Sequence, residues 1–208
     1  MQGRRNPFVA REGIPFVLLA FFASWLAFYY LGAVFAVPPA MLFVMFYLIF
    51  RDPRRVIPAV PLGIVSPVDG RVSAVDLVDR GVLQGEAHRV FIEIDVLGTY
   101  TARCPVEGNI KDLNTLAGDE VVDYRTNALW VQTDEGDDVV LQFGGYRFGL
   151  GPDSFVRYGE RLGQGQRCAY LRLTSVAEVH LPIECKVLVT PGQRVTAGLD
   201  LIGRLLPS

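Results

Sequence analysis

The chain has 208 residues, half of them hydrophobic, and a formal net charge of −2 at pH 7. That length suits one membrane segment plus one domain of ordinary size. The weak negative charge is untypical of proteins that bind polyanions, so no nucleic-acid partner is expected. Two histidines and three widely spaced cysteines without a CxxC motif give no metal-site pattern, and we expect the cysteines to be reduced and buried.

The first feature along the chain is an uncharged run from residue 14 to residue 50. It is longer than the roughly 20 residues that cross a bilayer once. Gly32 and Pro38-Pro39 divide the run near its middle. Because proline disrupts a helix interior, the pattern predicts two helices, over residues 14–31 and 39–50.

Arginines flank this run on both sides. Those before it are Arg4, Arg5 and Arg11, and those after it are Arg51, Arg54 and Arg55. Positive residues at both ends place both ends on the cytoplasmic side, which fits a transmembrane hairpin over residues 1–50 with these arginines at the membrane interface. The alternatives are a cleaved signal peptide, for which the run is too long, and a hairpin buried in a soluble core.

From residue 51 onward the sequence is typical of a β protein. Short runs rich in β-branched and aromatic residues are separated by glycine, proline and acidic clusters; they are RVSAVDLV, RVFIEIDV, ALWVQT, VVLQF, CAYLRLT, AEVHLP and KVLVT. The segment TDEGDD between the third and fourth runs predicts a hairpin turn. We therefore predict a mostly β fold, a compact sandwich or barrel-like domain over residues 51–208.

Two short patterns repeat within this region. Residues 156–165 and 189–198 share V-x-x-G-x-R-[LV]-x-x-G, and residues 66–72 and 104–110 share P-V-acid-G. Glycine supplies turns with positive φ, so both members of a pair are expected to form equivalent β-turn units. Paired turns of this kind resemble the flattened sandwich of biotinyl and lipoyl carrier domains, although Lys186 lacks the flanking residues of a carrier lysine.

Three motifs, RDPRRVIP, SPVDGRV and RLTSVAEVHLP, follow the hydrophobic segment in this order. Together they resemble the short, prokaryotic-type phosphatidylserine decarboxylases, over residues 51 to about 200. The resemblance implies a pyruvoyl cofactor, made when a serine attacks the carbonyl before it and the chain splits. It implies that phosphatidylserine forms a Schiff base with this group and loses CO₂ to give phosphatidylethanolamine. It further implies an inner-membrane protein with its β domain on the cytoplasmic face, and it leaves a homo-oligomer open.

The resemblance places the family's catalytic residues on this sequence. The family Asp falls on Asp69 and the pyruvoyl serine on Ser175, so the chain would be cut between Thr174 and Ser175. The family His falls on Tyr100, and Thr174 replaces the usual Gly. A phenol with a pKa near 10 is only about a thousandth ionised at neutral pH, which makes it a weaker base than histidine. Thr174 is β-branched and therefore stiffer than glycine.

These departures leave two hypotheses open. One is a membrane-associated decarboxylase; the other is a non-catalytic relative that acts as a lipid-binding or regulatory membrane protein. A second question is whether another histidine replaces the missing one. His88 precedes a predicted strand and is a candidate. His180 lies five residues beyond Ser175, an odd spacing that puts the two on opposite faces of a strand.

Overall fold

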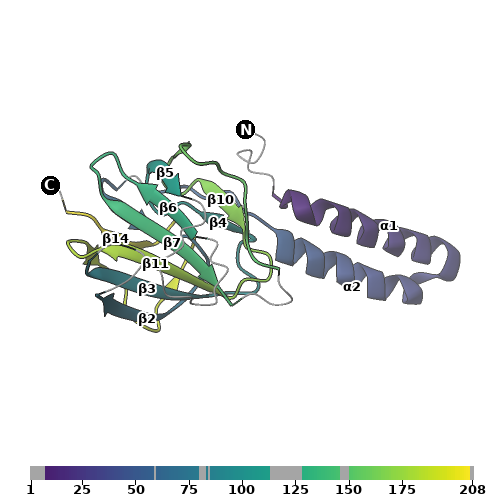
Figure 1. Cartoon of the computed structure of the whole chain (residues 1–208). Helices are drawn as coiled ribbons and strands as arrows, with labels where there is room; N and C mark the ends of the chain where they lie inside the picture. The colour runs from purple at the N-terminus through teal and green to yellow at the C-terminus, as the bar shows by residue number, and fades with distance from the viewer. Residues whose placement is uncertain are drawn as a thin grey trace. The chain divides into compact units, whose positions relative to one another are not determined.

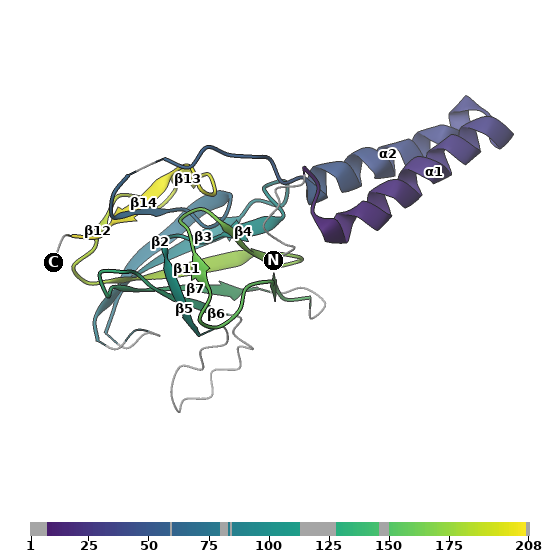
Figure 2. The same ribbon diagram turned by 90° about the horizontal axis from the view of Figure 1, so that it is seen from above.

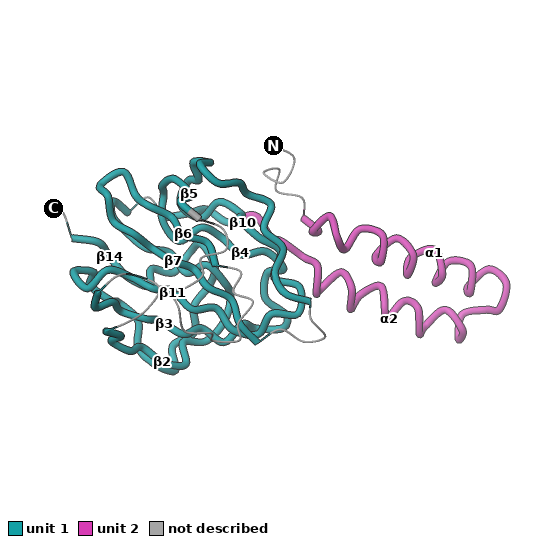
Figure 3. Tube along the Cα trace, in the orientation of Figure 1, with its two compact units in different colours: residues 1, 3, 55–208 teal, residues 2, 4–54 magenta. Residues whose placement is uncertain are grey.

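The computed structural model describes residues 8–58, 60–79, 83, 85–112, 128–145 and 150–206. Contacts within the chain divide it into two compact units, and the division falls between Arg54 and Arg55 (Figure 3). The first unit contains the helices and the second contains all the strands (Figure 1).

The helical unit is a hairpin of two apolar helices. A short 3-10 turn, η1 (Arg11–Gly13), leads into α1 (Ile14–Leu31), and α2 (Ala33–Phe50) follows after Gly32 alone. Each helix has 18 residues, about 27 Å at 1.5 Å per residue, close to the thickness of a bilayer's hydrocarbon core. Only 6% of each apolar window is buried, whereas a core helix of a soluble protein would be mostly buried. The predicted hairpin is confirmed.

The start predicted for the second helix is wrong. α2 begins at Ala33, and Pro38-Pro39 lies inside it rather than at its start. The chain reverses at Gly32 instead, which has a φ of 96° that other residues rarely adopt. Prolines are tolerated within membrane helices because neighbouring helices and hydroxyl side chains supply replacement hydrogen bonds. Pro38 and Pro39 leave the carbonyls of Val34 and Phe35 without their helical donors, and the Ser24 hydroxyl donates across the hairpin to the neighbouring Ala36 carbonyl, at 3.3 Å.

Aromatic contacts hold the two helices together. The ring centroid of Phe16 lies 5.8 Å from that of Phe50, and Phe21 lies 5.9 Å from Phe43. Residues early in α1 thus meet residues late in α2, as an antiparallel pair requires. At the open end a Cβ on Gly13 would lie 2.2 Å from the Phe50 ring, so only glycine permits this close approach.

The β unit is built from one large antiparallel sheet and two small ones. The strands are β1 (Gly63–Val65), β2 (Gly70–Val78), β3 (Ala87–Ile94), β4 (Thr101–Arg103), β5 (Gly108–Asp112), β6 (Ala128–Gln132), β7 (Asp138–Gly144), β8 (Asp153–Ser154), β9 (Arg161–Leu162), β10 (Arg167–Tyr170), β11 (Val176–Pro182), β12 (Lys186–Val187), β13 (Arg194–Val195) and β14 (Leu201–Arg204). Their orders are β13-β2-β3-β11-β7-β6-β5-β9, β1-β14-β12 and β4-β10-β8. Figures 1 and 2 both show β2, β3, β11 and β7 side by side. The mostly β, sandwich-like fold is confirmed; among the described residues the large sheet ends at β13 and β9 and does not close into a barrel.

The strand order has an internal two-fold symmetry. Reading the large sheet outward from its centre, β11, β3, β2 and β13 correspond to β7, β6, β5 and β9, and β1-β14-β12 corresponds to β4-β10-β8. Gly70 and Gly108 begin the equivalent strands β2 and β5. A Cβ on either would lie about 2 Å from a carbonyl oxygen of the next strand, at Glu93 or Gln132 (2.0 and 2.1 Å). The same backbone frame therefore occurs twice in the unit.

The repeated turns confirm the equivalence predicted from the sequence. Gly159, Gly165, Gly192 and Gly198 all lie in turns with positive φ, at 74°, 69°, 90° and 71°. Their hydrogen bonds also match in pairs. The Gly192 N–H donates to the Val72 carbonyl (2.7 Å), as the Gly159 N–H does to the Ile110 carbonyl (2.9 Å). The Gly198 N–H donates to the Ser66 carbonyl, as the Gly165 N–H does to the Cys104 carbonyl (both 2.8 Å). TDEGDD forms the predicted hairpin turn between β6 and β7. The three cysteines are free and buried, as expected.

Candidate active site

Three adjacent strands bring Asp69 and Ser175 to the same end of the large sheet. Asp69 immediately precedes β2, Ser175 immediately precedes β11, and β3 runs between these strands. The Asp95 N–H donates to the Asp69 carbonyl, and the neighbouring Ile94 N–H donates to the Ser175 carbonyl, each at 2.9 Å. Adjacent amides of one chain segment thus hold both residues. Two strand spacings separate their backbones, about 10 Å.

The Asp69 carboxylate accepts four hydrogen bonds. Arg55 donates two of them, from Nη1 at 2.5 Å and Nη2 at 2.7 Å. The backbone N–H groups of Ala197 (2.7 Å) and Thr99 (2.9 Å) donate the others. Burial alone would raise the pKa of Asp69, but the hydrogen bonds and charge of Arg55, with the two backbone donors, outweigh it and lower this pKa. With its lone-pair sites occupied, Asp69 is a fixed negative charge rather than a proton acceptor.

Arg55, which the sequence analysis placed at the membrane interface with Arg51 and Arg54, has a partner in the β unit that the sequence did not predict. Its side chain is only 12% exposed, and both terminal nitrogens of its guanidinium donate hydrogen bonds to the Asp69 carboxylate. Nη1 also donates to the Ala197 carbonyl at 2.8 Å. The arginine stands near the end of the RDPRR motif, but nothing in that local pattern identifies a partner that lies at position 69.

Ser175 occupies a space that exists because residue 145 is glycine. The Ser175 hydroxyl donates to the Gly145 carbonyl at 2.9 Å, and its N–H donates to the Gly144 carbonyl at 3.3 Å. Gly145 has a φ of 70°, and a Cβ on it would lie 2.1 Å from the Ser175 oxygen. No larger residue fits there without displacing the hydroxyl. Gly145 is a site residue that the sequence reasoning missed.

The turn before Ser175 is strained. Thr174 N–H donates to the Leu171 carbonyl at 3.1 Å, and Arg172 between them has a φ of 50°, in the left-handed region that favours glycine. Such conformations cost on the order of 1–3 kcal/mol and persist where the surrounding structure imposes them. The Thr174 hydroxyl is buried without a hydrogen-bond partner in the described part of the chain. Strain and an unsatisfied polar atom therefore adjoin the bond predicted to be cut.

Tyr100 lies next to this turn. Its carbonyl accepts from the Leu171 N–H at 2.9 Å, where the turn begins. Its half-buried ring packs on Tyr170, with 5.8 Å between centroids, and Tyr170 in turn contacts Phe155 at 5.1 Å. Tyr100 also directly follows Thr99, whose N–H binds Asp69. The backbone of Tyr100 is thus tied to both the acid and the serine-bearing turn.

Both histidines lie away from Ser175. His180 follows Glu178 on the face of β11 opposite the core, with 3.8 Å between Nε2 and the carboxylate. Burial and the charge of Arg89 lower the pKa of His180 to about 4. His88 is six residues from Ile94, the end of β3 near Ser175, which is about 20 Å along the strand. The hypothesis that His88 replaces the family histidine is therefore not supported.

The exposed ion pairs of Arg161 with Glu107 and Asp134 offer a control for a stability prediction on Arg55. Arg55→Ala should lower the free energy of unfolding by about 3 kcal/mol, because it leaves the Asp69 carboxylate, whose side chain is only 14% exposed, without its cation. Glu107 occupies the position equivalent to Asp69 in the other half, but it and its partner Arg161 are more than half exposed. Arg161→Ala should therefore cost much less stability than Arg55→Ala. Denaturant unfolding of the two variants measures this, and equal losses would contradict the assignment.

Comparisons with known proteins identify the family. The family model described as phosphatidylserine decarboxylase matches residues 42–203. The phosphatidylserine decarboxylase proenzyme of Nitrosomonas eutropha is 35% identical over 201 residues, covering 92% of this chain and 93% of its own. That of Burkholderia cenocepacia is 32% identical over 209 residues, covering 96% and 97%. A solved structure, the glucose permease IIA from Mycoplasma capricolum, is 18% identical with a TM-score of 0.47, covering 68% of this chain and 94% of its own. The chain belongs to the phosphatidylserine decarboxylase family.

Proposed function

We propose that this chain is a membrane-anchored proenzyme that cuts itself between Thr174 and Ser175 and then converts phosphatidylserine to phosphatidylethanolamine. The observation that carries the proposal is the position of the Ser175 hydroxyl at the end of a strained turn. It lies in the space left by the missing side chain of Gly145, which we call the glycine cradle. Two relatives that match nearly the whole chain are named phosphatidylserine decarboxylase proenzyme, which supports it.

The cut follows from the chemistry of a serine at this position. Ser175 Oγ attacks the Thr174 carbonyl carbon, so that a C–O bond forms as the peptide C–N bond breaks. Loss of the Ser175 α-proton then breaks the ester, releasing the Thr174 carboxylate, and water displaces ammonia from the new N-terminus. The resulting pyruvoyl group supplies a carbonyl that takes up the substrate amine and withdraws electrons as CO₂ leaves. The Ile94 N–H, which binds the Ser175 carbonyl, would keep this terminus in the sheet.

The proton of the Ser175 hydroxyl needs an acceptor. The Gly145 carbonyl receives the hydrogen bond but cannot retain a proton, and the Asp69 carboxylate already accepts four bonds. Tyr100 is the aligned position of the family base and follows Thr99, which Asp69 binds. In this proposal Asp69 is a positioning residue that fixes the Thr99–Tyr100 segment, and Tyr100 is the base.

The helical hairpin provides the membrane attachment. Both helices are long and apolar enough to cross a bilayer, and arginines stand at both ends of the hairpin sequence. By the positive-inside rule, the β unit lies on the cytoplasmic face of the inner membrane. Phosphatidylserine in that membrane is then the substrate.

The test of the proposed function is whether the chain is cut. The wild-type protein should run as two chains on a denaturing gel, and the C-terminal chain should resist Edman sequencing because its N-terminus is a pyruvoyl group. Ser175→Ala should leave one intact chain that releases no CO₂ from phosphatidylserine. A wild-type protein that remains one chain and has no activity would favour the non-catalytic alternative.

The identity of the base predicts how cutting depends on pH. If Tyr100 acts as its phenolate, the cutting rate should rise about tenfold per unit between pH 7 and pH 9, because the ionised fraction of a phenol rises at that rate. Tyr100→His with Thr174→Gly should cut faster and reach a plateau just above neutral pH. Tyr100→Phe should not cut. Quantifying the two chains over time measures the rates, and normal cutting by Tyr100→Phe would exclude the phenol.

The glycine cradle gives a separate prediction. Gly145→Ala should abolish cutting, because the new methyl group takes the position of the Ser175 oxygen. Gly136→Ala is the matched control: Gly136 also has positive φ, at 97°, but a Cβ there meets nothing within 4 Å. Both variants should lose about 1 kcal/mol of stability from backbone strain. Only Gly145→Ala should remain a single chain, and equal cutting in both would remove the cradle from the mechanism.

A further inference from the structure

Exposed aliphatic side chains stand in the loops that carry the site. We call them the apolar rim: Val56 (88% exposed), Val96 (85%), Leu97 (58%), Leu173 (42%) and Leu199 (40%). Tight turns in soluble proteins normally present glycine, proline and small polar residues. Large aliphatic side chains gathered around one site instead mark a surface that meets an apolar partner.

Each rim residue is close in sequence to a group that forms the site. Val56 follows Arg55, and Val96 and Leu97 lie between Asp95 and Thr99. Leu173 is in the strained turn that ends at Ser175, and Leu199 follows the turn whose Ala197 N–H binds Asp69. Hydrogen bonds close these turns, from Gly98 N–H to Asp95 O (2.9 Å) and from Leu199 N–H to Thr196 O (3.1 Å). The rim is therefore built on the same four loops as the site.

The covalent chain ties these loops to the membrane hairpin. Only residues 51–54 separate Phe50, the end of α2, from Arg55. A fully extended chain of that length reaches at most about 18 Å. Arg55, which binds Asp69, is therefore joined to the end of a helix long enough to cross a bilayer by a connection of no more than this length.

We propose that the apolar rim docks onto the bilayer that holds the hairpin, so that a lipid headgroup reaches Ser175 without its acyl chains leaving the membrane. The short connection keeps the bilayer at a high effective concentration near the rim, which favours it over a separate protein partner. Acidic residues, Asp95 and Asp200, stand in the same loops. Arg54, two residues before Val56, and Arg172, next to Leu173, balance these two acidic charges, so we expect the contact to be apolar insertion that is insensitive to salt. The catalytic consequence rests on the proposed function; the docking does not.

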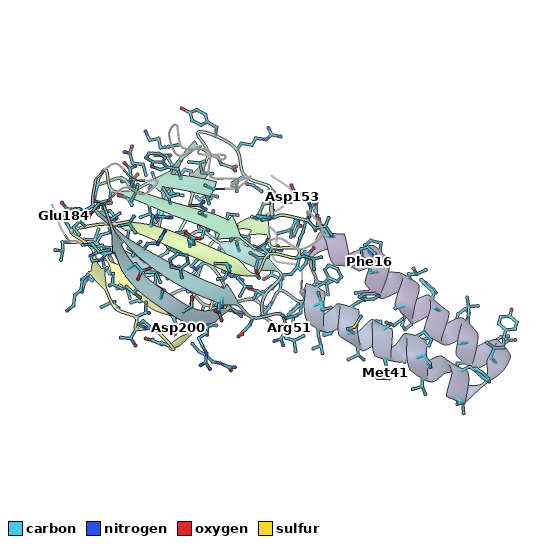
Figure 4. All side chains as sticks on the ribbon, turned by 60° about the horizontal axis from the view of Figure 1, so that its bottom comes forward. Phe16, Met41, Arg51, Asp153, Glu184 and Asp200 are labelled. Atoms are coloured by element: carbon cyan, nitrogen blue, oxygen red, sulfur yellow. The ribbon has the colours of Figure 1, made fainter. Side chains whose placement is uncertain are left out.

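Fluorescence at single introduced cysteines tests the docking. The three native cysteines are buried, so a thiol introduced by Leu97→Cys can be labelled selectively with an environment-sensitive dye. Leu77→Cys is the matched control, with 54% exposure against 58%. It lies seven residues from Gly70 along β2, about 23 Å from the site. Figure 4 shows that the β unit is long enough to hold a control far from the site, because Glu184 and Asp153 lie at its opposite ends. The Asp153 carboxylate binds Arg172, three residues before Ser175.

In vesicles of zwitterionic lipid containing the full chain, the dye at position 97 should shift to shorter wavelength. Lipids carrying a quencher near the headgroup should quench it at least twice as strongly as the dye at position 77, and 0.5 M salt should not reverse this. Equal quenching at both positions would overturn the proposal. So would a shift that depends on protein concentration in detergent without lipid, which would identify a second copy as the partner.

Activity separates docking from chemistry. Val96→Asp with Leu97→Asp should leave self-cutting unchanged, lower decarboxylation of phosphatidylserine in vesicles at least tenfold, and preserve the rate on a monomeric short-chain phosphatidylserine. Leu77→Asp should change none of these. An equal loss on both substrates would show that the rim supports the site itself and would overturn the proposal. If the wild type is not cut, the proposed function fails, and the fluorescence result alone decides the docking.

Discussion

One partly buried carboxylate joins parts of the chain that are remote in sequence. Asp69 binds Arg55 from the segment after the helices, Thr99 from the loop after β3, and Ala197 from a turn near the C-terminus. Buried ion pairs add little net stability compared with apolar packing, but removing one partner is costly. Here the pair fixes position: the loop that carries Tyr100 and the segment that follows the helical hairpin both bind the same acid. The arrangement of the site depends on this contact.

The internal symmetry shows what the frame alone provides. Glu107 stands where Asp69 does in the other half, after the same P-V pair and before an equivalent close-packed glycine, Gly108. Yet Glu107 is exposed and binds Arg161 at the surface, while the Asp69 side chain is only 14% exposed and accepts hydrogen bonds from backbone amides. Identical strand pairing therefore does not make a site. Side chains that enter from outside the repeat, above all Arg55, distinguish the two halves.

Local patterns were predictable, and long-range contacts were not. The turn glycines and the strands follow from backbone preference and side-chain alternation, which act over a few residues. The motifs indicated Asp69 and Ser175 and, through them, the family. The partnership of Arg55 with Asp69, and the fit of Ser175 against Gly145, depend on how distant segments pack. The start of α2 was missed for a related reason, because the hairpin partner offsets the cost of Pro38-Pro39.

The place of β11 has a consequence for the protein after a cut. Cutting before Ser175 puts β11 to β14 on a separate short chain, yet β11 lies between β3 and β7, β13 pairs with β2, and β14 pairs with β1. Strand pairing on both sides of β11 would hold the short chain to the long chain without any covalent link. The kinetics of refolding, however, would change from first order to second order. The intact precursor folds as one molecule, whereas the cut protein must reassemble from two chains, at a rate set by their concentration. The precursor is thus the form in which this topology is reached, and the mature protein is held in it kinetically.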